Sequence, residues 1–97
     1  MLSKKEILQK LESLMPELRE KYGVEKIGLF GSFSRDQGNE DSDIDLVVNY
    51  KERPKGWDYF SLGIYLEEVF GRKVDIAEPH CIKHQIRDKV MKQVKYI

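Results

Sequence analysis

Two aspartates stand two residues apart in a short apolar segment, and this spacing is the first sign of chemistry in the sequence. Asp43 and Asp45 flank Ile44. In a β-strand both carboxylates leave the same face, roughly 7 Å apart along the backbone, and they repel by about 2–3 kcal/mol at an effective dielectric constant near 20. A hard divalent cation such as Mg²⁺, shared with substrate phosphates, would offset this repulsion. The alternative is a pair of strand-end acids that only cap or solubilise a turn.

A glycine–serine turn precedes this pair in the chain. Gly31-Ser32 follows an apolar run and stands where a short helix is expected to begin. Glycine lets a phosphate approach the backbone, and a serine hydroxyl with the amides of a helix N-terminus can donate to it. No Gly-Lys-Ser/Thr follows, so the turn is not a Walker A loop. Beside the aspartate pair, the turn predicts a phosphate cradle next to a metal site.

A third acid, Asp75, lies between two apolar residues in a later segment. In a strand its neighbours face the other way, so a matching register beside Asp43 would bring the three carboxylates onto one face. Three carboxylates can hold two metal ions, of which one positions a triphosphate and the other activates an attacking hydroxyl. The alternative is a lone exposed strand aspartate, and the order of the strands decides between the two.

The segments that must position these residues predict a small fold with the order α-β-α-β-α-β-α. Ser3 with Glu6 is a capping box that opens the first helix, Pro16 predicts a kink or a break in it, and Gly23 ends it. Strands are expected at 24–30, 43–50 and 73–77, and later helices at about 33–37, 57–70 and 81–95. Helices on a small sheet make this an α/β (α+β) fold of two layers, with residues 1–97 as a single domain.

Apolar residues at helical spacing predict which helix faces are buried. In the 57–70 helix, Trp57, Phe60 and Ile64 broaden the apolar surface beyond one stripe, and we expect them in the core rather than on a partner surface. The last helix is expected to bury Ile82, Ile86, Val90 and Val94.

The composition limits the class of protein. The chain has 97 residues, of which 40% are apolar and 35% charged, a globular balance too apolar for a disordered chain. Lys plus Arg is 17 and Asp plus Glu is 17, so a generally basic nucleic-acid coat is excluded. No apolar run approaches the roughly 20 residues of a membrane span, and the first residues lack the apolar region of a secretory signal. We therefore expect a cytoplasmic protein.

The charges and the few metal-binding side chains are unevenly placed. Acids gather between residues 36 and 45, which favours a cation site. Bases gather between residues 83 and 95, which favours a phosphate or an acidic partner, with a solvated face as the alternative. His80 and His84 stand four residues apart without an HExxH context, so zinc is not expected there. Cys81 cannot form an internal disulfide and is expected to be a small apolar filler.

In its motif segments the sequence resembles the minimal nucleotidyltransferases, small members of the DNA polymerase β-like superfamily. The segments are Gly-Ser-Phe-Ser-Arg at 31–35, Ser-Asp-Ile-Asp-Leu at 42–46 and Arg-Lys-Val-Asp at 72–75. The resemblance runs from about residue 7 to residue 96. It implies the two-layer polymerase β-like fold with a small mixed sheet, and transfer of a nucleoside monophosphate from an NTP to a hydroxyl with release of pyrophosphate.

The resemblance also implies roles for the matching residues. Gly31 and Ser32 would hold the terminal phosphates, Asp43 and Asp45 would bind two Mg²⁺ ions, and Asp75 would ligate the second ion and help deprotonate the acceptor.

Two further residues are candidates for nucleotide binding. Arg35 is expected to neutralise phosphate or grip a partner, with a surface salt bridge to nearby acids as the alternative. Ser42 is expected to cap or orient the loop before Asp43.

The resemblance extends to a class of partner. Minimal members of the family are similar to the antitoxins of HEPN-domain toxins, which are ribonucleases, and there the acceptor is a toxin tyrosine modified with AMP from ATP. Because larger relatives carry extra domains for RNA or an antibiotic, the short chain favours a protein acceptor, with no membrane or nucleic acid as a direct partner. The alternative is an inert binding module that neutralises a toxin by masking it.

Overall fold

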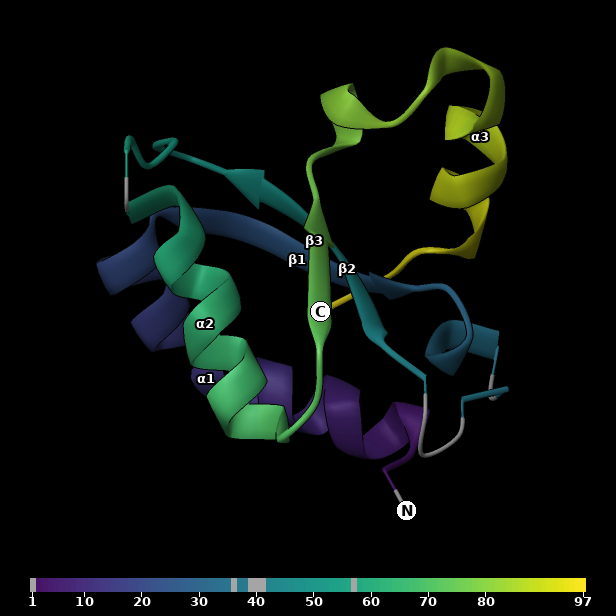
Figure 1. Ribbon diagram of the computed structural model, residues 1–97, viewed down its shortest axis with the longest axis horizontal. Helices are drawn as coiled ribbons and strands as arrows, with labels where there is room; N and C mark the ends of the chain where they lie inside the picture. Colours follow the sequence, from purple (N-terminus) through teal and green to yellow (C-terminus); the bar gives the residue numbers. More distant parts are fainter. Residues whose placement is uncertain (1, 36, 39–41, 57) are drawn as a thin grey trace.

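The elements of the chain follow one another in an alternating order in the computed structural model, which describes residues 2–35, 37–38, 42–56 and 58–97 (Figure 1). The α-helices are α1 (Lys4–Tyr22), α2 (Asp58–Phe70) and α3 (His84–Gln93), and the strands are β1 (Val24–Phe30), β2 (Ile44–Tyr50), β3 (Val74–Ala77) and β4 (Lys95–Tyr96). Two 3₁₀ helices complete the set, η1 (Phe33–Arg35) and η2 (Pro79–Cys81).

The strands form one mixed sheet in the order β3-β2-β1-β4. β1 is antiparallel to both β2 and β4, whereas β2 and β3 are parallel. Parallel neighbours need a crossover connection, and α2 supplies it between β2 and β3. Figure 1 shows α1 and α2 side by side against the sheet, with α3 standing apart from both. The predicted two-layer α/β fold is confirmed.

The core lies between the sheet and the two helices α1 and α2. The alternation predicted for β2 is observed, because Ile44, Leu46 and Val48 are fully buried on the face that meets the helices. Helix residues that complete this core are Ile7, Leu11, Met15, Leu18, Leu62 and Leu66. Since side chains alternate along a strand, Asp43 and Asp45 point to the opposite face of the sheet, away from α1 and α2.

Helix α1 begins and ends as predicted, but it does not break at Pro16. The Ser3 hydroxyl accepts a hydrogen bond from the Glu6 amide at 3.2 Å, and Gly23 ends the helix at φ 69° with its amide donating to the Leu18 carbonyl. The helix continues through Pro16, so of the two predicted alternatives, a kink or a break, the break is wrong. Buried Met15 and Leu18 anchor the helix to the sheet on both sides of the proline, and such packing outweighs one lost hydrogen bond.

The C-terminal segment differs from the prediction. Instead of one helix over 81–95, the chain forms η2, then α3, then the short strand β4. No residue of α3 is buried, and Ile86 is 47% exposed, so the predicted buried stripe is wrong. The reason lies at Gly28 of β1, which pairs with Tyr96. A side chain at Gly28 would overlap Val94, so the missing Cβ lets the C-terminal segment reach the sheet while α3 stays outside.

Helix α2 also leaves apolar side chains in solvent. Leu62 and Leu66 are fully buried, whereas Phe60 is 60% and Ile64 58% exposed. At 100° per residue, these two pairs lie on opposite sides of the helix, so only one side can meet the sheet. The expectation that Phe60 and Ile64 belong to the core is wrong, and Trp57 lies outside the described residues.

Candidate active site

The strand order brings the three predicted carboxylates together at one end of the sheet. In the parallel register of β2 and β3, Asp45 stands directly opposite Asp75, and Asp43 precedes β2 by one residue. All three belong to the face that α1 and α2 leave uncovered. The side chain of Asp43 is 41% exposed and that of Asp75 52% exposed. The site is therefore open to a substrate and a partner.

The surroundings of Asp45 disfavour its ionised form. Its partial burial raises the pKa of its carboxyl above the usual range, and the neighbouring charges of Asp75 and Asp43 raise it further. The positive charges of Arg35 and Lys73 act in the opposite direction without cancelling the shift. The face thus holds excess negative charge that an added cation would neutralise.

The Cα of Gly31 lies directly against the Asp45 side chain. The residue before it, Phe30, pairs with Asp45 across the β1–β2 ladder, and Gly31 then takes a left-handed φ of 75°. A Cβ at this position would overlap the Asp45 carboxylate oxygen Oδ2. Both the backbone angle and the space therefore require glycine, and the Gly31-Ser32 turn lies directly beside the acidic face.

The turn after Gly31 is tighter than predicted. In place of a helix over 33–37, the chain forms the three-residue η1. The amides of Ser34, Arg35 and Gln37 donate to the carbonyls of Gly31 and Ser32 at 2.9–3.1 Å, and the Ser34 hydroxyl donates to Gly31 at 2.7 Å. These three amides are used within the turn and are not available to a phosphate, and the role of Gly31-Ser32 in holding a phosphate stays a prediction.

Arg35 and Ser42 are held by contacts that the sequence did not predict. Arg35 Nη1 donates to Gln93 Oε1 of α3 at 3.0 Å and its Nε donates to Gln37 Oε1 at 3.2 Å. Ser42 accepts a hydrogen bond through its carbonyl oxygen from Arg72 Nη1 at 3.1 Å. Arg35 is therefore held near Asp45 by amide oxygens, and Ser42, the residue before Asp43, is held through its backbone carbonyl.

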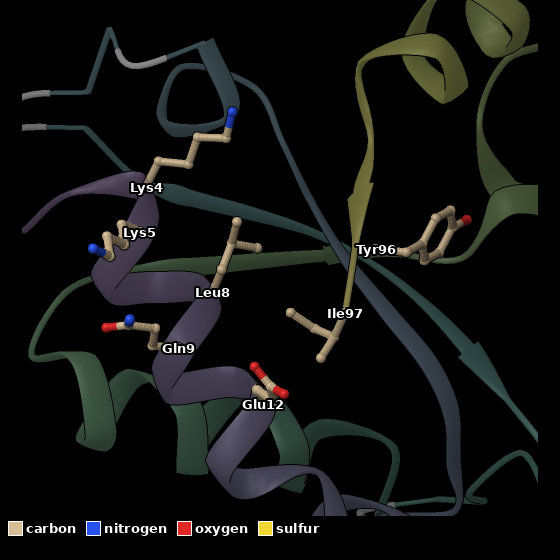
Figure 2. Close-up of a pocket in the computed structure, with 7 residues that line it drawn as sticks. All are labelled: Lys4, Lys5, Leu8, Gln9, Glu12, Tyr96 and Ile97. Atoms are coloured by element: carbon tan, nitrogen blue, oxygen red, sulfur yellow. The ribbon is translucent and has the colours of Figure 1, made fainter.

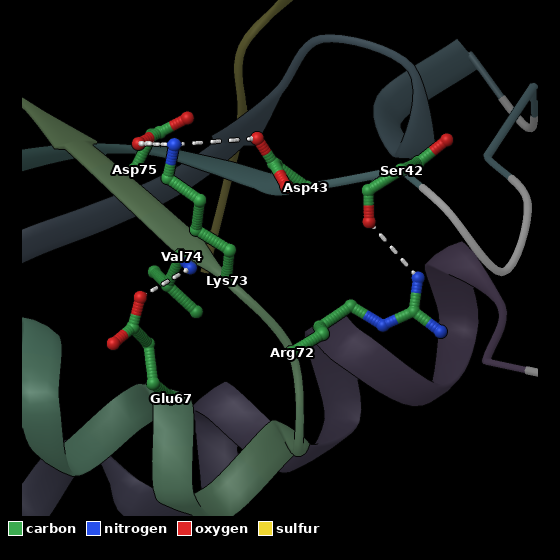
Figure 3. A network of polar contacts seen from close by, with 7 residues as sticks. All are labelled: Ser42, Asp43, Glu67, Arg72, Lys73, Val74 and Asp75. Carbon is green, nitrogen blue, oxygen red and sulfur yellow. Dashed lines mark hydrogen bonds and ion pairs between the residues drawn. The ribbon is translucent and has the colours of Figure 1, made fainter.

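Two bases of the α2–β3 turn lie beside the residues of the candidate site, and sequence reasoning missed both (Figure 3). Lys73 Nζ lies 3.9 Å from Asp43 Oδ2 and 3.9 Å from Asp75 Oδ1. Arg72, besides holding Ser42, places its guanidinium 5.1 Å from the centre of the Phe33 ring. The signal was present in the sequence, because both bases directly precede the Val74-Asp75 segment.

Backbone contacts fix where β3 begins. The Lys73 carbonyl accepts a hydrogen bond from the Ile44 amide at 3.0 Å. The Val74 amide donates to Glu67 Oε1 of α2 at 3.2 Å (Figure 3). Helix α2 thereby sets the register that places Asp75 beside Asp45.

The donor set of the acidic face suits a hard divalent cation. Its ligands are carboxylate oxygens from two adjacent strands, and oxygen is the ligand that Mg²⁺ prefers. Burial, and after it the charges of Asp75 and Asp43, raise the pKa of Asp45, and a bound cation would stabilise its ionised form. The carboxylates are not gathered as closely as ligands around an ion, since Lys73 stands between two of them.

A second group of ligand atoms occurs elsewhere. Within the described part of the chain, one group of three His, Cys, Asp or Glu residues has its ligand atoms within 4.8 Å of one another, and it consists of Glu78, His80 and Cys81. Glu78 Oε2 already accepts from Arg53 Nη2 at 3.0 Å and from Tyr59 at 3.2 Å. The Arg53 guanidinium would therefore compete with a metal ion for the Glu78 carboxylate. Cys81 is exposed, so its expected role as an apolar filler is wrong.

A cavity lies away from the acidic face, between α1 and the C-terminal end. It measures about 460 Å³. Figure 2 shows that Leu8 and Ile97 approach it from the two sides. Its lining residues are Lys4, Lys5, Leu8, Gln9, Glu12, Tyr96 and Ile97. The lining contains no predicted site residue, so the cavity plays no part in the candidate site.

The raised pKa of Asp45 leads to a prediction about stability. A carboxyl whose pKa is higher in the folded than in the unfolded protein lowers the free energy of unfolding at pH values above its unfolded-state pKa. Asp45→Asn is therefore expected to raise the melting temperature at pH 7.5 in EDTA, by up to a few degrees. The gain should disappear at pH values below about 3, where the carboxyl is protonated in both the folded and the unfolded state. Thermal melts at both pH values check this, and a variant that melts lower than wild type at pH 7.5 would contradict it.

Comparisons with known proteins agree with this geometry. Residues 11–97 match the family described as "Nucleotidyltransferase domain". The chain is 38% identical over 97 residues to the protein adenylyltransferase MntA of Thermococcus cleftensis. The alignment covers 100% of this chain and 98% of that protein. It is similar in structure to a minimal nucleotidyltransferase with a TM-score of 0.79 and 26% identity, over 97% of this chain and 95% of the other.

A more distant structural relative is part of a toxin–antitoxin pair. It comes from a complex of a tri-AMPylated HEPN toxin with an MNT antitoxin from Shewanella oneidensis. The TM-score is 0.66 at 22% identity, over 96% of this chain and 70% of the other, a likeness that concerns the fold. Taken with the full-length relative and the family match, these findings confirm the resemblance seen in the sequence, and the chain belongs to the minimal nucleotidyltransferases of the nucleotidyltransferase domain family.

Proposed function

We propose that this protein transfers AMP from ATP to a hydroxyl of a HEPN-type toxin, with Mg²⁺ at the acidic face, and so acts as an antitoxin. The observation that carries the proposal is the in-register pair of Asp45 and Asp75 with Asp43 beside them on the uncovered face of the sheet. The 38% identity to a protein adenylyltransferase over the whole of this chain supports AMP as the transferred group.

In the proposed reaction an acceptor oxygen attacks the α-phosphorus of ATP. The new bond joins that oxygen to AMP, the bond between the α-phosphorus and the bridging oxygen to the β-phosphate breaks, and pyrophosphate leaves with the electron pair. Asp43, Asp45 and Asp75 would hold two Mg²⁺ ions, which supply charge for the triphosphate and lower the pKa of the acceptor hydroxyl. Asp75, the most exposed of the three acids, takes up the acceptor proton.

The remaining candidate residues bind the nucleotide. Gly31 allows the chain to pass beside Asp45 without a side chain, and the Ser32 hydroxyl donates to a terminal phosphate. Arg35, which acts electrostatically on Asp45, neutralises phosphate charge. Ser42 orients the Asp43 loop through the carbonyl that Arg72 holds.

The acceptor we propose is a tyrosine of the toxin. In the Shewanella complex an AMPylated HEPN toxin is bound to its MNT antitoxin, which supports this class of partner. None of the helices that the structure describes is long and apolar enough to cross a bilayer. We propose a cytoplasmic setting, where ATP is at hand.

An experiment with two differently labelled ATP molecules tests the reaction. The protein is incubated with Mg²⁺, a HEPN-type partner and ATP labelled at either the α- or the γ-phosphate. We expect the α-label on the partner and the γ-label in pyrophosphate, because the bond between the α- and β-phosphates breaks. Label from γ-labelled ATP on the partner would indicate a kinase, and no label on a partner that is still neutralised would indicate a masking module.

A further inference from the structure

Lys73 is placed where a cation is needed. Its ammonium nitrogen lies 3.9 Å from an oxygen of Asp43 and 3.9 Å from an oxygen of Asp75 (Figure 3). These are the two outer carboxylates of the acidic face, and Lys73 also acts electrostatically on the third, Asp45. The single positive charge of Lys73 thus attracts all three carboxylates.

The backbone of Lys73 is hydrogen-bonded to β2, whereas its side chain is exposed and makes only long ion pairs. Its carbonyl accepts a hydrogen bond from the Ile44 amide at 3.0 Å, so its Cα stays at the start of β3. Its side chain is 66% exposed, and both ion pairs are longer than a hydrogen bond. A lysine is a compact point charge on a flexible stem, so it can leave the carboxylates at little cost.

We propose that Lys73 is the resident counter-ion of the acidic face, which holds Asp43 and Asp75 while no metal is bound and is displaced by the divalent cation. The inference rests on the proposed function and goes beyond it, because it makes Lys73 a competitor that weakens metal binding.

A titration with Mn²⁺ alone, without nucleotide or partner, tests the inference. We expect Lys73→Met to lower the dissociation constant for Mn²⁺ by about fivefold, the scale of a partly exposed charge interaction. Lys73→Arg keeps the charge and should stay close to wild type. Lys51→Met is the matched control, because Lys51 follows the opposite end of β2. Unchanged or weaker Mn²⁺ binding by Lys73→Met would overturn the inference.

Thermal melts in EDTA give a second readout that needs no metal. Lys73→Met should melt a few degrees below wild type, because the carboxylates then repel without compensation. The difference should vanish in an Asp43→Asn/Asp75→Asn background, and a difference that persists there would overturn the counter-ion role. If wild type itself binds no Mn²⁺, the proposed function fails together with the inference. If wild type binds Mn²⁺ and Lys73→Met binds it equally well, only the inference fails.

Discussion

The Asp43→Asn/Asp45→Asn double variant is expected to lose nucleotidyl transfer by about 10³-fold or more, while its fold stays intact. Removing a single preorganised electrostatic contact in an active site commonly costs 10²–10³-fold, and this change removes two charges that the proposed metal ions require. The core face of β2 is not altered, since Ile44, Leu46 and Val48 lie on the side opposite the substituted carboxylates. Transfer of α-labelled AMP to the partner measures the loss.

Stability separates a catalytic from a structural role for these acids. The ionised form of Asp45 is destabilised by burial and by the charges of Asp75 and Asp43, and the Asp43 pair with Lys73 is exposed and long. The double variant should therefore melt in EDTA at or above the wild-type temperature. Asp58→Asn/Asp88→Asn removes two acids elsewhere and should transfer AMP normally. Near-normal transfer by the Asp43/Asp45 variant would refute the assignment, and a much lower melting temperature in EDTA would mean that these acids hold the fold.

Gly31→Ala is expected to reduce transfer by about 10²-fold and to destabilise the protein. A left-handed φ of 75° costs alanine about 1–2 kcal/mol. The new Cβ would also overlap Asp45 Oδ2, so Asp45 must move. A displacement of about 1 Å in a catalytic group can cost 10²-fold in rate. Transfer rates and melting temperatures of the variant measure the two effects.

Gly56→Ala is the matched control for this prediction. Gly56 has a similar φ of 60° but nothing within 4 Å of an added Cβ. It should show the backbone strain as a lower melting temperature, with unchanged transfer. If Gly31→Ala and Gly56→Ala lose stability equally and both transfer AMP normally, then the contact between Gly31 and Asp45 has no catalytic meaning.

The parts of the fold that sequence reasoning predicted are those with strong local signals. The strand over 24–30 has the predicted bounds, since Gly23 and Gly31 punctuate an apolar run. The Asp43 and Asp45 pair could be placed on one face because strand side chains alternate. Placing Asp75 beside them required the strand order, which depends on packing of α2 that no local pattern encodes.

The failures share a physical cause, because they concern contacts between distant segments. Lys73 and Arg72 directly precede Asp75 in the sequence, but their contacts with Asp43 and Ser42 depend on the pairing of β2 with β3. The last helix has an apolar stripe, yet the two-residue strand β4 directs the chain to Gly28 and leaves α3 exposed. Pro16 is tolerated because α1 is held by packing rather than by helix propensity.

The central claim is tested most directly by the intact mass of a HEPN-type partner after incubation with this protein, ATP and Mg²⁺. We predict that wild type adds the mass of one or more AMP groups, that fragmentation locates them on a tyrosine, and that the Asp43→Asn/Asp45→Asn variant adds none. A partner that forms an equally stable complex with both proteins and never gains mass would contradict the claim and indicate a module that acts by masking.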